Sequence, residues 1–218
     1  YVIFGDSRLQ VIDVSDPTNP QQVSRIPMGG DTSNGIAIVG DHAYVARGAA
    51  MVVIDISDPR NPRRVSLYQT GGWASHVAAS GDQAYLIDSG LQVIDVSDPV
   101  TPRRMGQFQP YYRATTVVAL TEHYAYTADG VRFEVIDRSN PAQLRSVGGL
   151  EVNGWTSGLV LSGNYAYLNV DEETQGRLVV IDVGNPADPR QIGTFDMERP
   201  ATDLAVSGQF VYLTAEGV

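Results

Sequence analysis

A six-residue phrase recurs five times along the chain at nearly regular intervals. It reads Ile-Asp-Val-Ser-Asp-Pro in its commonest form, and the copies span residues 12–17, 54–59, 94–99, 136–141 and 181–186. The first Asp of each copy is residue 13, 55, 95, 137 or 182, so the intervals are 42, 40, 42 and 45 residues. A fixed period of this length indicates stacked supersecondary units.

Each unit contains short β-strand patterns separated by turn residues. In the second unit we expect strands at 35–39, 43–46, 51–56 and about 63–68, because Val, Ile, Ala and Tyr residues there are separated by Gly, Asp and Pro. No stretch has helical periodicity. Four antiparallel strands in about 40 residues is the size of one propeller blade. The sequence therefore predicts an all-β fold, a β-propeller of four-stranded antiparallel blades.

A recurring Tyr in the second strand aligns the units with one another. The first strand then presents large aliphatic residues on one face and small residues on the other, because side chains alternate along a strand. We expect the small face of one blade to pack against the large face of the next. The small column, seven residues before each Tyr, is Ala37, Ala78, Ala119, Val160 and Ala205.

The repeat runs through the whole chain, so we expect a single propeller domain over residues 1–218. The approximate repeat units are 1–34, 35–74, 75–114, 115–156, 157–201 and a partial unit at 202–218. The pattern gives three strands in the first unit, four in each of the next four and two in the last. About five blades are therefore covered, and because neither five nor six blades close with this strand count, we expect a segment of a six- or seven-bladed ring.

The composition excludes some partners. The formal net charge of −10 and pI of about 4.6 argue against nucleic acid, which is bound by clustered Lys and Arg. There is no Cys and hence no disulfide or thiolate metal site, and no apolar run is long enough to span a bilayer.

The chain resembles the LVIVD repeat family of β-propellers. The resemblance is carried by residues 90–99 (GLQVIDVSDP) and by the Gly-Asp-x-Ala-Tyr phrase of residues 40–44 and 81–85. It implies a bacterial scaffold outside the cytoplasm, secreted, periplasmic or on the cell surface, with no reaction common to the family. The later units depart from the motif, since Asn140 and Asn185 replace Asp.

Residues at one end of the blades change chemistry from unit to unit, as an asymmetric binding site requires. They lie in the loops before each first strand and between second and third strands, where binding sites are usually found on rigid scaffolds. Alternatively, these side chains fill and cap a wet central channel. The candidate binding residues are Asn34, Trp73, His76, Tyr111, Tyr112, Arg113, Asn153, Trp155, Arg199 and Asp203.

Two sets of repeated polar residues are interpreted as structural. The Asp of each repeat phrase is expected to accept hydrogen bonds from the following turn, since a turn is needed in every blade and an active site only once. A polar column ten residues before each Tyr is expected to bond neighbouring backbone and hold adjacent blades in register. The column comprises Asn34, Ser75, Thr116, Ser157 and Thr202.

The acidic run Asp171, Glu172 and Glu173 offers oxygen ligands of the kind that Ca²⁺ takes, but it lacks the spacing of calcium loops, and a solvated loop is the alternative. His76 could act as a general base if Asp203 or Tyr112 approached it. We predict no catalytic residue and no cofactor.

These observations favour a non-enzymatic scaffold that binds a protein or a surface glycan or polymer through its loop-rich face. One alternative is a subunit of a larger surface or membrane-associated assembly. A second alternative is a propeller enzyme of the lactonase or hydrolase kind, with a metal in its central channel. The last requires carboxylates or His side chains converging at the channel mouth.

Overall fold

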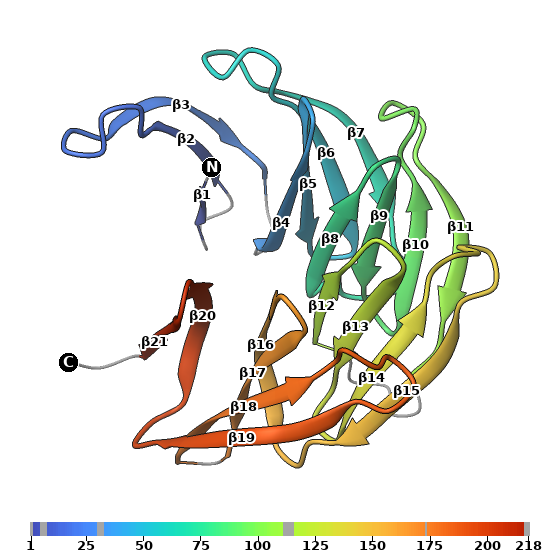
Figure 1. Ribbon diagram of the computed structural model, residues 1–218. Coiled ribbons are helices and arrows are strands. Elements are labelled where there is room, and N and C mark those ends of the chain that lie inside the picture. Colours follow the sequence, from blue (N-terminus) through green and yellow to red (C-terminus); the bar gives the residue numbers. More distant parts are fainter. Residues whose placement is uncertain (1, 5–7, 30–32, 111–115, 173, 216–218) are drawn as a thin grey trace. The chain divides into compact units, whose positions relative to one another are not determined.

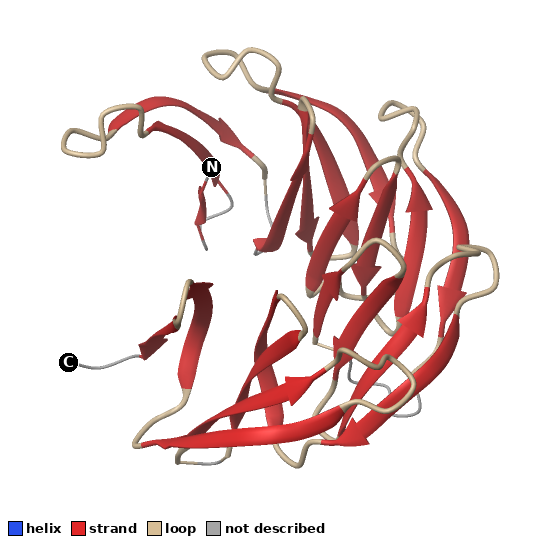
Figure 2. Ribbon diagram, in the orientation of Figure 1, coloured by secondary structure: helices blue, strands red, loops and turns tan. Residues whose placement is uncertain are grey.

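The computed structural model describes residues 2–4, 8–29, 33–110, 116–172 and 174–215. Every regular element in these residues is a β-strand, as the sequence predicts, and no described helix is long and apolar enough to cross a membrane (Figure 2). The chain divides into two compact units, Tyr1–Met105 and Gly106–Val218, and each is described by itself.

Unit 1 contains three antiparallel sheets in which strand order follows chain order (Figure 1). The last strand, β11, contains the boundary between the units. The first sheet comprises β1 (Val2–Phe4), β2 (Arg8–Asp13) and β3 (Gln21–Pro27). The second comprises β4 (Ser33–Val39), β5 (His42–Arg47), β6 (Ala50–Asp55) and β7 (Arg63–Gln69). The third comprises β8 (His76–Ser80), β9 (Gln83–Ile87), β10 (Leu91–Asp95) and β11 (Arg103–Phe108).

Unit 2 is built in the same way. Its first sheet comprises β12 (Val117–Leu120), β13 (Tyr124–Ala128), β14 (Arg132–Asp137) and β15 (Arg145–Glu151). Its second comprises β16 (Trp155–Ser162), β17 (Tyr165–Asp171), β18 (Gly176–Asp182) and β19 (Arg190–Met197). Its third comprises β20 (Ala201–Ser207) and β21 (Phe210–Ala215). The four-stranded antiparallel blades predicted from the repeat are therefore confirmed in four sheets.

Glycine sets the tight turn between the first and second strands of most sheets. Gly40, Gly81, Gly163 and Gly208 have φ values of 54, 56, 57 and 59°. Only glycine adopts this left-handed region without a steric penalty. The turns therefore fix the strand register, which places the recurring Tyr of every repeat on the same face of its sheet.

The sheets of each unit pack face to face through apolar side chains. In unit 1, Ala37 from the small face of β4 lies in one cluster with Val77 of β8, and the buried Tyr44 and Met51 belong to the same cluster. In unit 2, Leu159 of β16 packs against the cluster that contains the buried Phe133. The small face of one blade thus meets the large face of the next, as predicted, and at about 25 cal/mol per Å² this apolar burial forms the core.

Neighbouring sheets make a second contact near the turns that join the third strand of each sheet to the fourth. The fourth strand is bulged where it pairs with the third, and a Ser or Gly beside the bulge contacts the Pro carbonyl of the next repeat phrase. Ser24 Oγ donates to Pro59 O, and Ser66 Oγ donates to Pro99 O, both at 2.6 Å. The same position is Gly106 against Pro141 O and Gly148 against Pro186 O, where an added Cβ would overlap the carbonyl oxygen.

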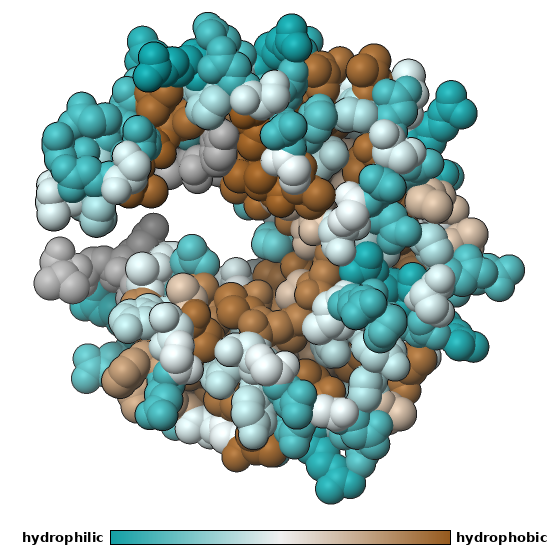
Figure 3. All heavy atoms as spheres, turned by 45° about the horizontal axis from the view of Figure 1, so that its top comes forward, coloured by the Kyte–Doolittle hydropathy of each residue, from teal (hydrophilic) through white to brown (hydrophobic). Residues whose placement is uncertain are grey.

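Hydrophilic side chains cover the outer turns of unit 1, such as those that join β2 to β3 and β6 to β7 (Figure 3). Polar turns at the end of an apolar blade keep the backbone groups of the turn in water. The buried apolar residues of the core clusters lie on the faces between sheets, whereas Val14 and Val100 in these turns are exposed.

Candidate binding surface

The described candidate residues fall into two groups, one in each unit. Unit 1 holds Asn34, Trp73 and His76, and unit 2 holds Asn153, Trp155, Arg199 and Asp203. Tyr111, Tyr112 and Arg113 lie outside the described residues. The pairing of His76 with Asp203 or Tyr112 therefore stays a prediction.

In unit 1 the candidate residues have different environments. Trp73 is 56% exposed, whereas His76 is partly buried at the start of β8, where its Cα lies 3.4 Å from the position of a Cβ added to Gly35. Asn34 donates from Nδ2 to the carbonyl of Ala74 at 2.8 Å. Asn34 is thus committed to the neighbouring sheet, and Trp73 is the candidate side chain most open to a partner.

The bond made by Asn34 recurs along the polar column. Thr116 Oγ1 donates to Thr156 O at 2.6 Å, and Ser157 Oγ donates to Ala201 O at 3.1 Å. In each case the acceptor immediately precedes the column residue of the next repeat. The interpretation that this column holds adjacent blades in register is confirmed for these three residues.

In unit 2 an exposed tryptophan lies two residues along the chain from Asn153, whose carbonyl accepts a hydrogen bond from an ion-paired arginine. Trp155, at the start of β16, is 54% exposed, and its Cε3 lies 3.7 Å from the position of a Cβ added to Gly130. Arg177 donates from Nη2 to Asn153 O at 2.9 Å, and its Nη1 lies 3.1 Å from Glu172 Oε1. We call these five residues the Trp155 surface. It combines an aromatic ring with a charge pair and a backbone polar edge.

Arg177 was not among the candidates from sequence. A signal for it exists in the sequence. The position five residues before the repeat Asp is also arginine in the first and fourth repeats, as Arg8 and Arg132. The partners of Arg177, Asn153 and Glu172, belong to two different loops. That pairing becomes visible only when the register of β17 and β18 is known.

Behind this surface, the contact between β16–β17 and β20 contains a buried polar cluster. Asn169 is fully buried and donates from Nδ2 to Ser157 Oγ at 2.6 Å and to the carbonyl of Ala201. Burial raises the pKa of the Asp171 carboxyl, and a hydrogen bond with Ser157 opposes that shift. The sequence predicted the part played by Ser157 but not that of Asn169.

The acidic run does not form a converging set of oxygen ligands in the described residues. Asp171 is partly buried beside Ser157, whereas the carboxylate of Glu172 is paired with Arg177, and Glu173 lies outside the described residues. No group of three His, Asp or Glu side chains in the described part of the chain is placed to hold a metal ion. We therefore derive no metal chemistry from this loop.

The two remaining candidates of unit 2 are exposed. Asp203 accepts a hydrogen bond from the backbone N–H of Leu204 at 2.8 Å. The carbonyl of Arg199 lies 2.7 Å from the position of a Cβ added to Gly176, the first residue of β18. The backbone of Arg199 is thus close to the start of β18, one residue before Arg177.

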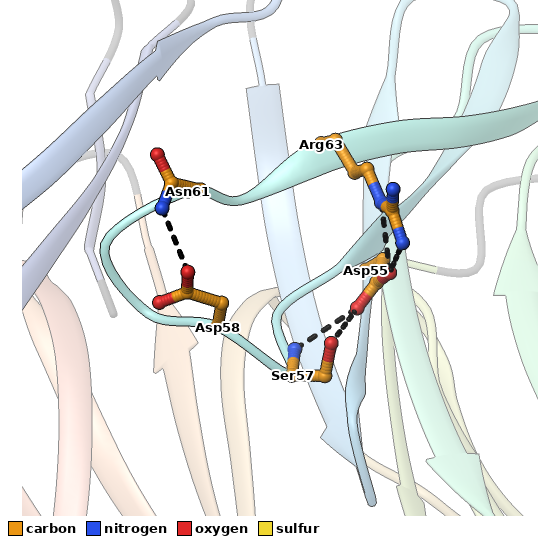
Figure 4. A network of polar contacts seen from close by, with 5 residues as sticks. All are labelled: Asp55, Ser57, Asp58, Asn61 and Arg63. Atoms are coloured by element: carbon orange, nitrogen blue, oxygen red, sulfur yellow. Dashed lines mark hydrogen bonds and ion pairs between the residues drawn. The ribbon is translucent and has the colours of Figure 1, made fainter.

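The repeated Asp residues are structural, as predicted. Asp55 accepts at Oδ1 from the N–H and hydroxyl of Ser57, at 3.0 and 2.6 Å, and at Oδ2 from Arg63 (Figure 4). The Ser57 hydrogen bonds, followed by those from Arg63, hold the pKa of Asp55 well below its usual value. Equivalent bonds from Ser139 and then Arg145 lower the pKa of Asp137 from 3.8 to about 2.

The second acidic position of the phrase explains why Asn can replace Asp there. Asp58 Oδ1 accepts from the N–H of Arg60 at 3.0 Å, and Asn140 Oδ1 accepts from the N–H of Ala142 at 3.1 Å. Both side chains supply one acceptor oxygen to a turn, so the charge is not required.

A cavity of about 540 Å³ lies in unit 1, at the turns rather than near the candidate residues. Its lining includes Val11, Val14, Val23 and Pro59, and it borders the contact of Ser24 with Pro59. The polar residues in its lining belong to the turns and already bond one another. A small-ligand pocket instead needs polar side chains that converge on the ligand and fix its orientation.

Comparisons with known proteins agree with this architecture. The chain is similar to a protein in the "Crystal Structure of Mitotic Checkpoint Complex" (12% identity, TM-score 0.78), over 97% of this chain and 66% of that one. It is similar to a functionally unknown protein from Desulfotomaculum acetoxidans DSM 771 (15%, 0.74), over 90% of this chain and 69% of that one. It is also similar to a protein from Lactobacillus plantarum (14%, 0.68), over 85% of this chain and 61% of that one. At these identities the likeness shows the fold alone.

No curated protein matches the sequence. The profile of the LVIVD repeat matches six segments that together cover nearly the whole chain: residues 1–26, 29–70, 71–109, 113–150, 153–197 and 198–217. The matched segments, the strand order and the bonded turn of each repeat phrase all agree. The chain is therefore a β-propeller protein of the LVIVD repeat family.

Proposed function

We propose that this chain is a non-enzymatic scaffold that binds a protein or a surface polymer through the Trp155 surface, outside the cytoplasm. The observation that carries the proposal is the half-exposed indole of Trp155, two residues along the chain from Asn153, whose carbonyl accepts a hydrogen bond from the ion-paired Arg177. Tryptophan and arginine are the residue types most enriched at binding hot spots.

The frame beneath Trp155 is held firmly, which suits a binding role. The hydroxyl of Thr156 donates to Asp129 O at 3.1 Å, and its carbonyl accepts from Thr116. Asp129 is itself buried and accepts from two backbone N–H groups of its own turn. A side chain carried on ordered backbone loses little conformational freedom when it binds.

A fluorescence experiment tests this function. The chain has two tryptophans, so Trp73→Phe leaves Trp155 as the single reporter. Soluble neutral, anionic and cationic polysaccharides and an array of peptides are titrated into this variant. We expect a binder to shift the emission. Trp155→Ala, whose affinity for that binder is measured by titration calorimetry because no reporter remains, should weaken it by about thirtyfold, as hot-spot truncation does.

Arg177→Gln keeps the length of the side chain and removes its charge, so it tests whether the ion pair contributes to the same surface. A binder whose affinity is unchanged by both substitutions would place the interface elsewhere and contradict the proposal.

A second candidate is a part of a larger assembly, a ring of six or seven blades of which these repeats form a segment. A specific observation favours it. Tyr44, Tyr85 and Tyr126 are 3, 0 and 3% exposed, whereas Tyr212 of β21, at the same repeat position, is 58% exposed. A side chain that three earlier repeats bury, and that the fifth buries in part as Tyr167, is open here, as is Phe210 at 66%.

A further inference from the structure

Two asparagines of this chain are each followed by a glycine, and the fold constrains one of them much more than the other. Among the eight asparagines, four precede a proline, whose nitrogen carries no hydrogen: Asn19, Asn61, Asn140 and Asn185. Asn164 precedes a tyrosine and Asn169 a valine, so a bulky side chain stands beside each of them. The remaining pairs are Asn34-Gly35, within β4, and Asn153-Gly154, just before β16.

An Asn-Gly pair can lose ammonia in water without an enzyme. The glycine N–H gives its proton to base, and the nitrogen attacks the Cγ of the asparagine side chain. A bond from this nitrogen to Cγ forms, the bond from Cγ to Nδ2 breaks, and Nδ2 leaves as ammonia with a proton from water. Water then opens the cyclic imide: at Cγ it yields aspartate, and at the main-chain carbonyl carbon it yields isoaspartate. Glycine favours the attack because it has no Cβ to obstruct the approach and permits the backbone rotation that is needed.

Asn34 is held against this reaction. Its Nδ2 donates to the carbonyl of Ala74 at 2.8 Å, and the following residue, Gly35, pairs with Ala46 of β5. A Cβ added to Gly35 would lie 3.3 Å from the backbone nitrogen of Val77, so this backbone is packed against the next sheet. The Asn34 side chain cannot turn toward the Gly35 nitrogen without breaking its bond to Ala74.

Asn153 has no such restraint. It lies between β15 and β16, and it is exposed. No hydrogen bond joins its side-chain amide to any residue that the structure describes, and only its backbone carbonyl is engaged, by Arg177 Nη2 at 2.9 Å. The amide is therefore free to rotate toward the nitrogen of the next residue.

The glycine that follows Asn153 is required by packing. Gly154 has a φ of 128°, in the region that favours glycine, and a Cβ there would lie 2.5 Å from Val170 Cγ1. Its N–H donates to the carbonyl of Gly130 at 3.2 Å, at the long end of the range for such bonds. Local opening of this one bond at the surface exposes the nitrogen and needs little free energy. The fold thus keeps a glycine beside an unrestrained asparagine.

We propose that Asn153 is a site of spontaneous deamidation, at which water replaces the side-chain amide by a carboxylate and releases ammonia. Asn34 keeps its amide in the folded chain. The reaction goes beyond the proposed binding function and does not depend on it.

The product changes the charge of the Trp155 surface. The new carboxylate belongs to the residue whose carbonyl bonds Arg177, and Arg177 is already paired with Glu172 at 3.1 Å. A further negative charge thus enters a surface whose arginine has its partner. Isoaspartate also adds a methylene to the main chain two residues before Trp155. The effect of these changes on a bound partner rests on the proposed function.

The test compares the folded chain with the same chain in denaturant, both kept in mildly alkaline buffer until the denatured chain has reacted. Cleavage after arginine places Asn34 in residues 26–47 and Asn153 in residues 146–177, and mass spectrometry of the fragments locates each new carboxylate. In the folded chain we expect Asn153 to convert about tenfold or more faster than Asn34, because Asn34 must first open its strand. In denaturant the two should convert at similar rates, since both precede glycine.

Two results would overturn the proposal. One is conversion of Asn34 and Asn153 at similar rates in the folded chain, which would show that the fold does not select between them. The other is an unconverted Asn153 in the folded chain after the denatured chain has reacted, which would show that the fold protects Asn153 as well as Asn34.

Asn153→Gln is the matched control. It keeps an exposed amide but places it one methylene farther from the following nitrogen, where ring closure is much slower. The folded variant should release less ammonia, and its fragment 146–177 should keep its mass. A fragment that still gains a carboxylate would place the reaction at Asn164 or Asn169 and contradict the assignment. No measurement here involves a ligand, so a failure of the Trp155 surface as a binding site would leave these results unaffected.

Discussion

Two contacts between neighbouring blades solve the same packing problem with different chemistry. Between β4–β7 and β8–β11, Ala46 packs with Met51 and Val77 in an apolar cluster, and the described hydrogen bonds lie at its margins, as from Asn34 to Ala74 O. Between β16–β17 and β20 the residue equivalent to Ala46 is Asn169, and it bonds Ser157 and Ala201 instead. The repeat thus specifies how blades meet, and single substitutions decide whether a given contact is dry or polar.

The apolar contact should be the more sensitive to truncation. Met51 is fully buried between the two sheets. Met51→Ala should lower the free energy of unfolding by about 2–5 kcal/mol, because it removes buried surface and leaves a cavity. Denaturant unfolding measures this loss. Met105→Ala, at a site 40% exposed, is the control and should change stability by about 0.5 kcal/mol or less; equal losses would show that the Met51 contact is not a packed core.

The polar contact should respond to loss of its hydrogen bonds. Asn169→Ala installs the residue found at the equivalent position of the apolar contact, but it removes the amide donor shared by Ser157 Oγ and Ala201 O and leaves Ser157 as the one described donor to that carbonyl. We expect a loss of about 1–3 kcal/mol in the same unfolding experiment, the cost of unpaired buried polar groups. Asn153→Ala, which removes an exposed side chain and keeps the carbonyl that Arg177 uses, should be nearly neutral. A neutral Asn169→Ala would mean that the two contacts are interchangeable.

The smallest expected effect is the pH dependence of stability, which has opposite signs at Asp137 and Asp171. The pKa of Asp137 falls from 3.8 to about 2 on folding, so its contribution is complete above pH 3.8 and is lost as pH falls toward 2. The pKa of Asp171 is raised by burial, so ionisation of this group opposes folding, and stability is regained as pH falls through its folded pKa.

Thermal melts of Asp137→Asn and Asp171→Asn between about pH 7 and 2 check this comparison. The first variant should lose part of the acid-induced fall in Tm. The second should melt higher than the parent at neutral pH, with the difference vanishing in acid. Parallel curves for both variants would contradict the two signs.

Much of the fold could be predicted from sequence because the repeat exposes it. The strands, the turns and the residues that face a neighbouring blade depend on local propensity and on the repeat period. The repeat shows both in five copies. The bonds made by Asn34, Thr116 and Ser157 were predictable for the same reason, since a polar residue at one register position has the same backbone neighbour in each unit.

The candidate surface was predictable only in part. Trp155 and Asn153 stand out as departures from the repeat, but Arg177 and Asn169 depend on partners contributed by other strands or loops. Such pairs are single events with no second copy to compare. The number of blades and the role of Tyr111, Tyr112 and Arg113 remain predictions, since the last three lie outside the described residues.

The column bonds of three repeats have a direction. Where the bond forms, from Asn34, Thr116 and Ser157, the donor belongs to one repeat and the acceptor to the repeat that follows it. Interfaces of this head-to-tail kind do not end of themselves. A gene segment of about 40 codons that was copied in frame would therefore encode both the donor and the acceptor of this contact. Such a protein can change its number of blades without a new kind of contact between them.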